Sequence, residues 1–206
     1  MFDIGANRGQ FSLAASLNSD AYIFAFEPLL NPASIYRKVF ENNKKVKIFQ
    51  AAIGPSVKEE MMHISTKDDS SSLFKISSLQ NELFTGTHEV GLEKVSIAPL
   101  DHFISSKEIS SPALLKLDVQ GFELEALNGC QSLFHKFDQI YCECSFIPLY
   151  EGQKLSSEII SFLNTYNYEL IGFIILRRHL MVLAFKLIYN LSIDQTKLLK
   201  FKICTK

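Results

Sequence analysis

The stretch Phe2-Asp-Ile-Gly-Ala-Asn-Arg-Gly9, near the start of a chain of 206 residues, decides the expected fold. Apolar residues precede its two glycines and a helical pattern follows over residues 10–17, which is typical of a turn between a strand and a helix. Glycines in such a turn let the backbone approach a ligand closely, and the helix that follows presents free N–H groups. The spacing is Gly-x-x-x-Gly and not the Gly-x-Gly-x-x-Gly of dinucleotide sites, so no pyrophosphate has to be accommodated. Asp3, at the strand end, suits instead a ligand with a cationic amino group.

Beyond this turn, apolar runs of strand length alternate with helical patterns. We expect strands over residues 1–4, 21–26, 46–52, 113–117, 139–143 and 168–175. We expect helices over residues 10–17, 32–42, 122–134 and 156–165. Two more extended runs, 59–65 and 95–98, flank a Ser-rich segment, Thr66–Glu93, which we expect to be a long mobile loop with a short helix. The alternation predicts an α/β fold with a mostly parallel sheet covered on both sides, and a single domain over 1–206 because no linker or repeat interrupts it.

The composition excludes several classes of protein. With 47% hydrophobic residues the chain can fill a packed core, which excludes intrinsic disorder. Lys and Arg number 21 against 22 Asp and Glu, and the net charge of -1 gives no electrostatic reason to expect nucleic acid as a partner. The most apolar stretch, residues 171–190, is interrupted by basic residues and cannot cross a bilayer as a clean helix. We expect no transmembrane segment, but an ordinary core strand and helix there, with membrane-surface contact as the minor alternative.

The four cysteines lack the spacing of a metal site. Such sites use Cys-x-x-Cys pairs, whereas Cys142 and Cys144 are two residues apart on one face of an expected strand. Cys130 and Cys204 have no partner at a matching distance in the sequence. We therefore predict reduced, mostly buried thiols in a cytoplasmic protein, and no metal.

Three further acids are expected at strand ends, on the edge of the sheet where open α/β folds bind ligands. Glu27 ends the second strand, 24 positions after Asp3, where a carboxylate can accept hydrogen bonds from both hydroxyls of a ribose. Asp118 and Glu143 follow two later strands. Acids gathered at one edge repel one another unless they meet cations or hydrogen-bond donors, and a sulfonium cofactor with an ammonium group is one such partner.

Taken together, these residues resemble the FkbM family of S-adenosylmethionine-dependent methyltransferases. The resemblance covers about residues 1–172 in order and spacing. Its motifs are Phe2-Asp-Ile-Gly-Ala-Asn-Arg-Gly9, Ala25-Phe-Glu-Pro28, Ala51-Ala-Ile-Gly54, Pro99-Leu-Asp101, Leu115-Lys-Leu-Asp-Val-Gln-Gly-Phe-Glu-Leu-Glu125 and Tyr141-Cys-Glu-Cys-Ser145. It implies a class I methyltransferase fold, a Rossmann-like three-layer sandwich. It also implies O-methyl transfer from S-adenosylmethionine onto a glycan or small metabolite.

The resemblance also implies roles for individual residues. The residues implied to bind the methionine end of the cofactor are Asp3, Gly5, Asn7 and Gly9. Glu27 is implied to bind the ribose. The residues implied to contact the adenine are Pro28, Leu29, Gln50, Ala51 and Ala52. Asp118 is placed close to the sulfonium and the acceptor.

An alcohol nucleophile benefits from a base that removes its proton. Asp118 and Glu143 are the leading candidates for that catalytic base. His63, His88 and His102 are weaker ones, because they lie in segments without a clear place in the expected fold, and a solvated or hydrogen-bonded surface position explains each of them better.

The chain departs from the family pattern in three places. Gln120 stands where the family usually has Glu, and a neutral amide cannot act as a base. The chain begins almost on the first glycine turn, without the usual preceding segment, which suggests a truncated or divergent member. Beyond Ile175 the family pattern is lost.

Two other functions therefore stay open: a catalytically inactive protein that binds S-adenosylmethionine, and a nucleotide-binding oxidoreductase, which would bind NAD. The acceptor pocket is expected from Thr66–Glu93 with Phe146, Tyr150 and Glu151. The sequence leaves the acceptor and the oligomeric state undetermined.

Overall fold

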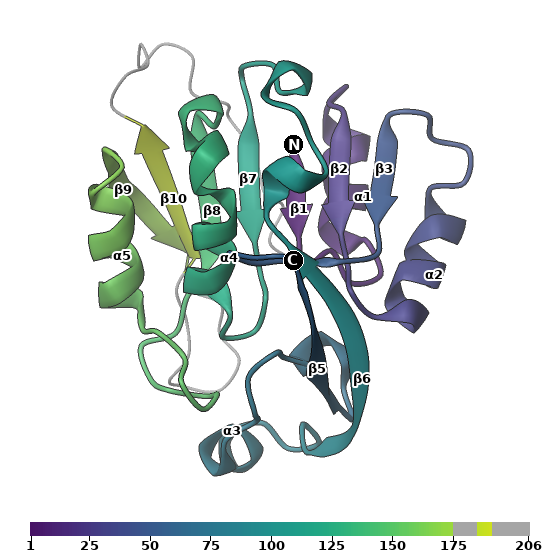
Figure 1. Ribbon diagram of the computed structural model, residues 1–206, viewed down its shortest axis with the longest axis vertical. Helices are drawn as coiled ribbons and strands as arrows, with labels where there is room; N and C mark the ends of the chain where they lie inside the picture. The colour runs from purple at the N-terminus through teal and green to yellow at the C-terminus, as the bar shows by residue number, and fades with distance from the viewer. Residues whose placement is uncertain (175–184, 191–206) are drawn as a thin grey trace.

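The computed structural model describes residues 1–174 and 185–190 of the chain. Seven strands form one sheet in the order β3-β2-β1-β7-β8-β10-β9 (Figure 1). They are β1 (Phe2–Ile4), β2 (Ile23–Phe26), β3 (Val46–Phe49), β7 (Leu114–Leu117), β8 (Gln139–Glu143), β9 (Tyr168–Ile174) and β10 (Phe185–Asn190). The first five of these pair in parallel, and β10 runs antiparallel to both of its neighbours. The expected α/β fold with a mostly parallel sheet is confirmed.

Helices cover the two faces of this sheet, with α4 and α5 on the viewer's side in Figure 1 and α1 behind β2. The α-helices packed around it are α1 (Gln10–Asn18), α2 (Leu30–Val39), α4 (Glu123–Cys130) and α5 (Ser156–Asn164). Short 3-10 helices are η2 (Leu100–His102), η3 (Ser106–Glu108) and η4 (Gln131–Lys136), the last of which continues directly from α4. In α5, Ile159 and Leu163 lie four residues apart and are both fully buried, because positions i and i+4 share one helix face.

A second, smaller sheet projects from the carboxyl edge of the first (Figure 1). It has the order β4-β6-β5, with β4 (Ala52–Ile53), β5 (Lys58–Ser65) and β6 (Glu89–Ala98). The expected strand over 46–52 is corrected here: it ends at Phe49, and Ala52 and Ile53 pair with Ile97 and Ala98 of β6 instead.

The segment expected to be one long loop is partly regular. It holds η1 (Asp68–Ser70) and α3 (Ser78–Leu83), and residues 89–93 already belong to β6, where they pair with β5. Ser72 returns to His63 through two backbone hydrogen bonds of 2.8 and 3.0 Å. The pairing of β5 with β6 joins residues 24 or more positions apart in the chain, so no local sequence pattern predicts it.

Two cores hold the sheets together. The larger one packs strand residues such as Phe2, Ile4 and Leu115 against Ala126 and Leu127 of α4. The other joins the second sheet to the first through Leu29, Ala52, Met62, Leu73, Val95, Ile97 and Phe122. This second core fixes β5 and β6 over the carboxyl ends of the parallel strands.

The C-terminal part of the chain is described only in its two strands. The apolar stretch 171–190 contains the end of β9 and all of β10, while residues 175–184 and Cys204 lie outside the described residues. Cys130, Cys142 and Cys144 are buried free thiols. None of the helices within 1–174 has the length and apolar character that a membrane crossing requires. The single-domain organisation over 1–206 stays a prediction.

Candidate active site

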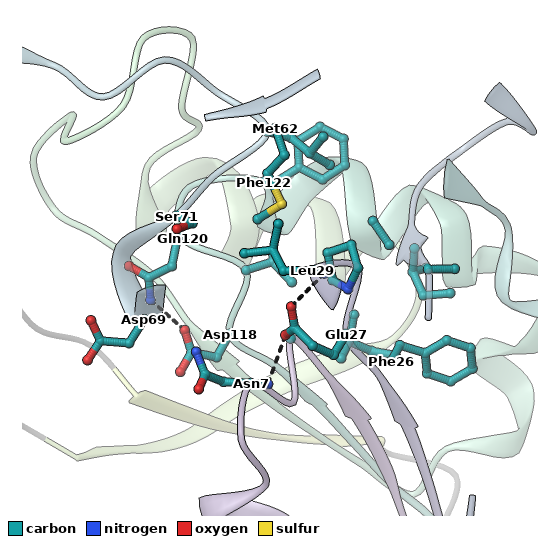
Figure 2. A pocket seen from close by; sticks show the side chains of 18 residues that line it. Asn7, Phe26, Glu27, Leu29, Met62, Asp69, Ser71, Asp118, Gln120 and Phe122 are labelled. Atoms are coloured by element: carbon teal, nitrogen blue, oxygen red, sulfur yellow. Dashed lines mark hydrogen bonds between the residues drawn. The ribbon is translucent and has the colours of Figure 1, made fainter. Parts of the chain in front are cut away.

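A cleft opens at the carboxyl ends of β1, β2 and β7 (Figure 2). This is the point where the order of the sheet reverses, because the chain leaves β1 toward β2 on one side and β7 toward β8 on the other. The second sheet and η1 supply the opposite wall through Ala52, Ile53, Met62 and Asp69.

The turn after β1 brings the backbone close to the loop after β7. Gly5 has φ +73°, and a Cβ there would overlap the carbonyl oxygen of Asp118. The N–H groups of Gly5 and Ala6 donate to the carbonyl of Phe26 at 3.0 Å, which locks the turn onto β2. Asn7, at φ 47°, lines the cleft. The turn therefore needs glycine to let two strand ends meet.

Gly9, which the family resemblance implies as a cofactor residue, lies at the start of α1. It has φ +93° and begins α1, and a Cβ there would meet the rings of Tyr36 and Phe40 at 2.9 and 2.8 Å. Both rings belong to the packing of α2 against β2. Gly9 is not among the residues that line the cleft, so it serves helix packing.

Asp3 also faces away from the cleft. Its side chain is fully buried, with Oδ1 at 2.8 Å from Lys116 Nζ and Oδ2 accepting from Ser12 Oγ at 2.6 Å. Lys116 Nζ also donates to the carbonyl of Gly5 at 2.9 Å. Its charge is neutralised by Lys116, and the pair braces β1, β7 and α1. A contact of Asp3 with a ligand's amino group stays a prediction.

Glu27 closes one wall of the cleft with its carboxylate (Figure 2). Its side chain is buried, with only 5% of the residue exposed, and it accepts from the N–H of Asn7 at 2.9 Å and from that of Leu29 at 3.0 Å. Burial raises the pKa of Glu27 to about 7, although these two N–H groups act in the opposite direction. Each carboxylate oxygen keeps a second lone pair for a ligand's hydroxyl.

Asp118 and Glu143 form a carboxyl pair at the ends of β7 and β8. Burial, together with the charge of Asp118, raises the pKa of Glu143 well above its ordinary value. Asp118 lines the cleft, whereas Glu143 lies behind it. Of the two candidates for the base, Asp118 is therefore the one placed to meet an acceptor in the cleft.

The sequence analysis missed several residues of the cleft. Apolar ones are Phe26, Ile53, Met62, Leu73, Val119 and Phe122, and polar ones are Asp69, Ser71 and Gln120. Met62 comes from β5, and Asp69, Ser71 and Leu73 belong to the segment Thr66–Glu93 from which an acceptor pocket was expected. The others stood in motifs that the sequence analysis had singled out, without a role of their own: Phe26, Ile53, Val119, Gln120 and Phe122. Gln120 Nε2 donates to Asp118 Oδ1 at 2.7 Å.

Of the expected cofactor residues, eight line the cleft: Gly5, Asn7, Glu27, Pro28, Leu29, Ala51, Ala52 and Asp118. Gln50 does not, because its Oε1 accepts from Arg37 Nη2 at 3.1 Å on the outer surface. Which of the eight contact a cofactor stays a prediction.

The residues expected around an acceptor lie apart from one another. Tyr150 is only 2% exposed and packs against Gly121, so its ring is not free to stack on a sugar. Glu151 pairs with Lys75 at 3.0 Å on the surface. Phe146, at 58% exposure on the loop after β8, is open to solvent. Only Phe146 of these three offers an exposed aromatic surface.

The three histidines lie away from the cleft. His63 Nδ1 is 2.7 Å from Glu89 Oε2, His88 Nε2 is 3.0 Å from Thr66 Oγ1, and the ring of His102 packs edge-on against its neighbour in the chain. None of them lines the cleft. Over the part of the chain that the structure describes, no three His, Cys, Asp or Glu side chains converge in a way that could hold a metal ion.

Glu123 is a buried carboxyl group whose ionisation is expected to affect the stability of the protein. Its Oε1 accepts from the N–H of Gly121 at 3.0 Å and of Val119 at 3.4 Å, and burial raises its pKa from 4.5 to about 7. A pKa raised by folding contributes stability below the unfolded value, and that stability is lost as the pH rises through about 7. Glu123→Gln keeps the accepting oxygen and cannot ionise. We expect the variant to exceed wild type in free energy of unfolding by up to about 3 kcal/mol at about pH 8, and to differ little near pH 4.5.

Denaturant unfolding at both pH values checks this expectation. Glu158→Gln is the control of opposite sign, because the N–H of Leu155 lowers the pKa of exposed Glu158. A Glu123→Gln variant that is less stable than wild type at about pH 8 would show that the ionised carboxylate is the favoured form.

The sheet order, with its last strand inserted antiparallel between β8 and β9, and the cleft at the carboxyl edge define a class I methyltransferase fold. The chain belongs to the FkbM methyltransferase domain family, whose model matches residues 3–170.

Two curated relatives are methyltransferases. The chain is 28% identical over 160 residues to a 2-O-methyltransferase, NoeI, of Sinorhizobium fredii, which covers 74% of this chain and 66% of that protein. It is also 28% identical over 169 residues to a hexuronic acid methyltransferase, AglP, of Haloferax volcanii, covering 77% of this chain and 64% of that protein. The chain thus spans just under two thirds of the length of both relatives.

The fold recurs in a crystal structure of methyltransferase FkbM from Methylobacillus flagellatus. The TM-score is 0.58 at 16% sequence identity, over 92% of this chain and 43% of that one. This likeness concerns the fold alone.

Proposed function

We propose that this chain binds S-adenosylmethionine in the cleft and transfers its methyl group to a hydroxyl on a sugar or small metabolite. The observation that carries the proposal is one cleft with Glu27 and Asp118 both on its surface, at the reversal point of the sheet. The family and the printed names of the two relatives support methyl transfer and a sugar acceptor.

The residues of the cleft fit this cofactor. Glu27 is a buried carboxylate whose raised pKa reflects lost solvation, and the two hydroxyls of a ribose would restore that solvation as hydrogen-bond donors. Leu29, Ile53 and Phe122 offer an apolar wall for an adenine ring. The cofactor's ammonium and sulfonium charges suit a cleft that holds Asp69 and Asp118.

In the proposed reaction the cofactor supplies an electrophilic methyl group, and this chain's residues position the acceptor and take its proton. Asp118, at the cleft surface, accepts the proton of the hydroxyl as its oxygen attacks. Glu143 lies behind it, where burial raises its pKa well above the ordinary value. Lys116, fixed by Asp3, keeps a positive charge close to both carboxyl groups and limits their repulsion.

The other functions considered from the sequence give different outcomes in the same experiment. Purified, folded protein is titrated calorimetrically with S-adenosylmethionine, S-adenosylhomocysteine and NAD. It is then incubated with methyl-labelled cofactor and a panel of neutral sugars, amino sugars and uronic acids. We expect the cofactor to bind and label to pass to at least one sugar.

Absence of cofactor binding would overturn the proposal, and tight binding of NAD alone would favour an oxidoreductase. Cofactor binding without transfer to any acceptor would favour the catalytically inactive form. The cytoplasmic location and the lack of a nucleic-acid partner remain parts of the proposal.

A further inference from the structure

The segment from η1 to the residue before α3, residues 68–77, supplies a wall of the cleft and is held by the loops after β7 and β8. Ser72 is fully buried, and its Oγ donates to the carbonyl of Gln120, in the loop after β7, at 2.6 Å. The N–H of Ser77 donates to the carbonyl of Leu149, in the loop after β8, at 3.1 Å. The wall is therefore fixed from two sides, and the side chains that it directs into the cleft keep their places.

Asp69 is the charged side chain of this wall. It is the middle residue of η1, it is exposed, and it lines the cleft. Its Oδ1 accepts from the neighbouring Ser70 Oγ at 3.3 Å. Over the part of the chain that the structure describes, Asp69 forms no ion pair. Its carboxylate is therefore available to accept hydrogen bonds from a ligand.

Asp69 lies on the side of Asp118 that faces away from Glu27 (Figure 2). Glu27 is the residue proposed to bind the ribose of the cofactor, and Asp118 the one proposed to meet the hydroxyl that receives the methyl group. All three residues line the same cleft. The space beyond Asp118, which Asp69 borders, is therefore the space for the rest of the acceptor.

The charge of the cleft is acidic on its described surface. Its charged residues are Glu27, Asp69 and Asp118, and no Lys, Arg or His within residues 1–174 lines it. The nearby Lys116 is buried and directs its ammonium group to Asp3 at 2.8 Å. S-adenosylmethionine brings a single net positive charge, which leaves the cleft acidic when the cofactor is bound. An acceptor that carries a carboxylate would meet like charges there without a cation to pair with.

We propose that Asp69 is a specificity-determining residue: it accepts hydrogen bonds from donors beside the methylated hydroxyl and restricts the acceptor to sugars without an acidic group. The hydroxyl or ammonium groups of a neutral or amino sugar donate to a carboxylate, whereas a uronate is repelled. The inference rests on the proposed function and narrows its acceptor. It also separates this chain from the relative AglP, which is named a hexuronic acid methyltransferase.

The test compares methyl transfer to methyl glycosides of the gluco, galacto and manno series, each in its neutral, amino and uronate form. Saturating methyl-labelled cofactor gives kcat and KM for each sugar. We expect wild type to prefer the neutral or amino form over the uronate by at least about 30-fold in kcat/KM. Asp69→Asn keeps the shape and removes the charge. We expect it to lower this preference by at least about tenfold, mainly through KM, and to bind the cofactor within about threefold of wild type.

Asp101→Asn is the matched control. Asp101 is the middle residue of η2, as Asp69 is of η1, and it is also exposed. It too accepts from a serine hydroxyl, that of Ser132 at 2.8 Å, but it does not line the cleft. Its substitution should leave the preference among the sugars unchanged.

Asp69→Lys is the second variant. It introduces a cation into the wall, and we expect it to favour the uronate over the neutral form. A wild type that uses the uronate as well as the neutral form, or a preference that neither variant changes, would overturn the inference. Asp69→Asn that weakens cofactor binding and leaves the preference unchanged would make Asp69 a cofactor residue, and would overturn it too. Transfer to none of the sugars would instead count against the proposed function, and the inference would fall with it.

Discussion

Replacing Glu27 by alanine is expected to weaken the binding of S-adenosylmethionine by at least about 100-fold. Among the residues that the structure describes, this carboxylate is the only acid that is both buried and on the β2 wall of the cleft. It accepts hydrogen bonds from the N–H groups of Asn7 and Leu29 and holds them in place. Hydrogen bonds to a charged group contribute about 1.5–3 kcal/mol each, and a ribose diol makes two. Calorimetric titration of both proteins measures the difference directly.

Glu93→Ala is the matched control for this substitution. Its Oε1 accepts from the N–H of Leu30 at 3.0 Å, at the same end of α2, yet Glu93 does not line the cleft. Its removal tests whether loss of any acceptor at the start of α2 weakens binding. We expect Glu93→Ala to bind the cofactor within about threefold of wild type, which corresponds to less than about 0.7 kcal/mol.

The pH dependence of the same titration gives a second readout for Glu27. Its pKa is about 7, and the ionised form is the one that accepts from both hydroxyls. Cofactor affinity should therefore fall as the pH decreases through about 7, approaching tenfold per pH unit below it, and the Glu27→Ala variant should lose this dependence. A variant that binds as wild type does, or that keeps the full pH dependence, would remove Glu27 from the site.

The strand ends of the main sheet could be predicted from the sequence, and with them the position of the cleft. Glu27 and Asp118 each follow a short apolar run, and the carboxyl ends of parallel strands meet at one edge whatever the details of packing. Only the order and direction of the strands are needed to bring these two residues to one cleft. For this reason a pattern of short motifs sufficed to locate them.

The direction of individual side chains could not be predicted in the same way. β1 is buried on both faces, so alternation of polar and apolar residues carries no information about which way Asp3 points. Its partner Lys116 sits in the middle of an apolar run 113 positions later, and burial of that lysine makes sense only with the ion pair in place. The wall built by the second sheet was missed for a related reason, because β5 and β6 pair across more than twenty residues.

Replacing Gly5 by alanine is expected to destabilise the protein by more than about 4 kcal/mol and to abolish cofactor binding. Two effects add at this position. The backbone has φ +73°, which costs a residue with a Cβ about 1 kcal/mol or more, and the added carbon would overlap the carbonyl of Asp118. The overlap is with backbone on β7's exit loop, so it can be relieved only by separating β1 from β7 or by displacing Asp118. Either movement opens the cleft where the methionine end of the cofactor is proposed to lie.

Two further glycines separate these effects. Gly152 has φ +88° with open space around its missing Cβ, so Gly152→Ala measures the backbone strain alone, about 1 kcal/mol. Gly91 has neither a positive φ nor a close neighbour, and Gly91→Ala should be neutral or slightly stabilising. Thermal unfolding of the three variants beside wild type should rank Gly5→Ala lowest, by roughly 10 °C or more. If Gly5→Ala lost no more stability than Gly152→Ala, the ends of β1 and β7 would not be in contact, and this side of the cleft would be built differently. A Gly5→Ala protein that stayed folded and still bound S-adenosylmethionine would move the cofactor away from this turn altogether.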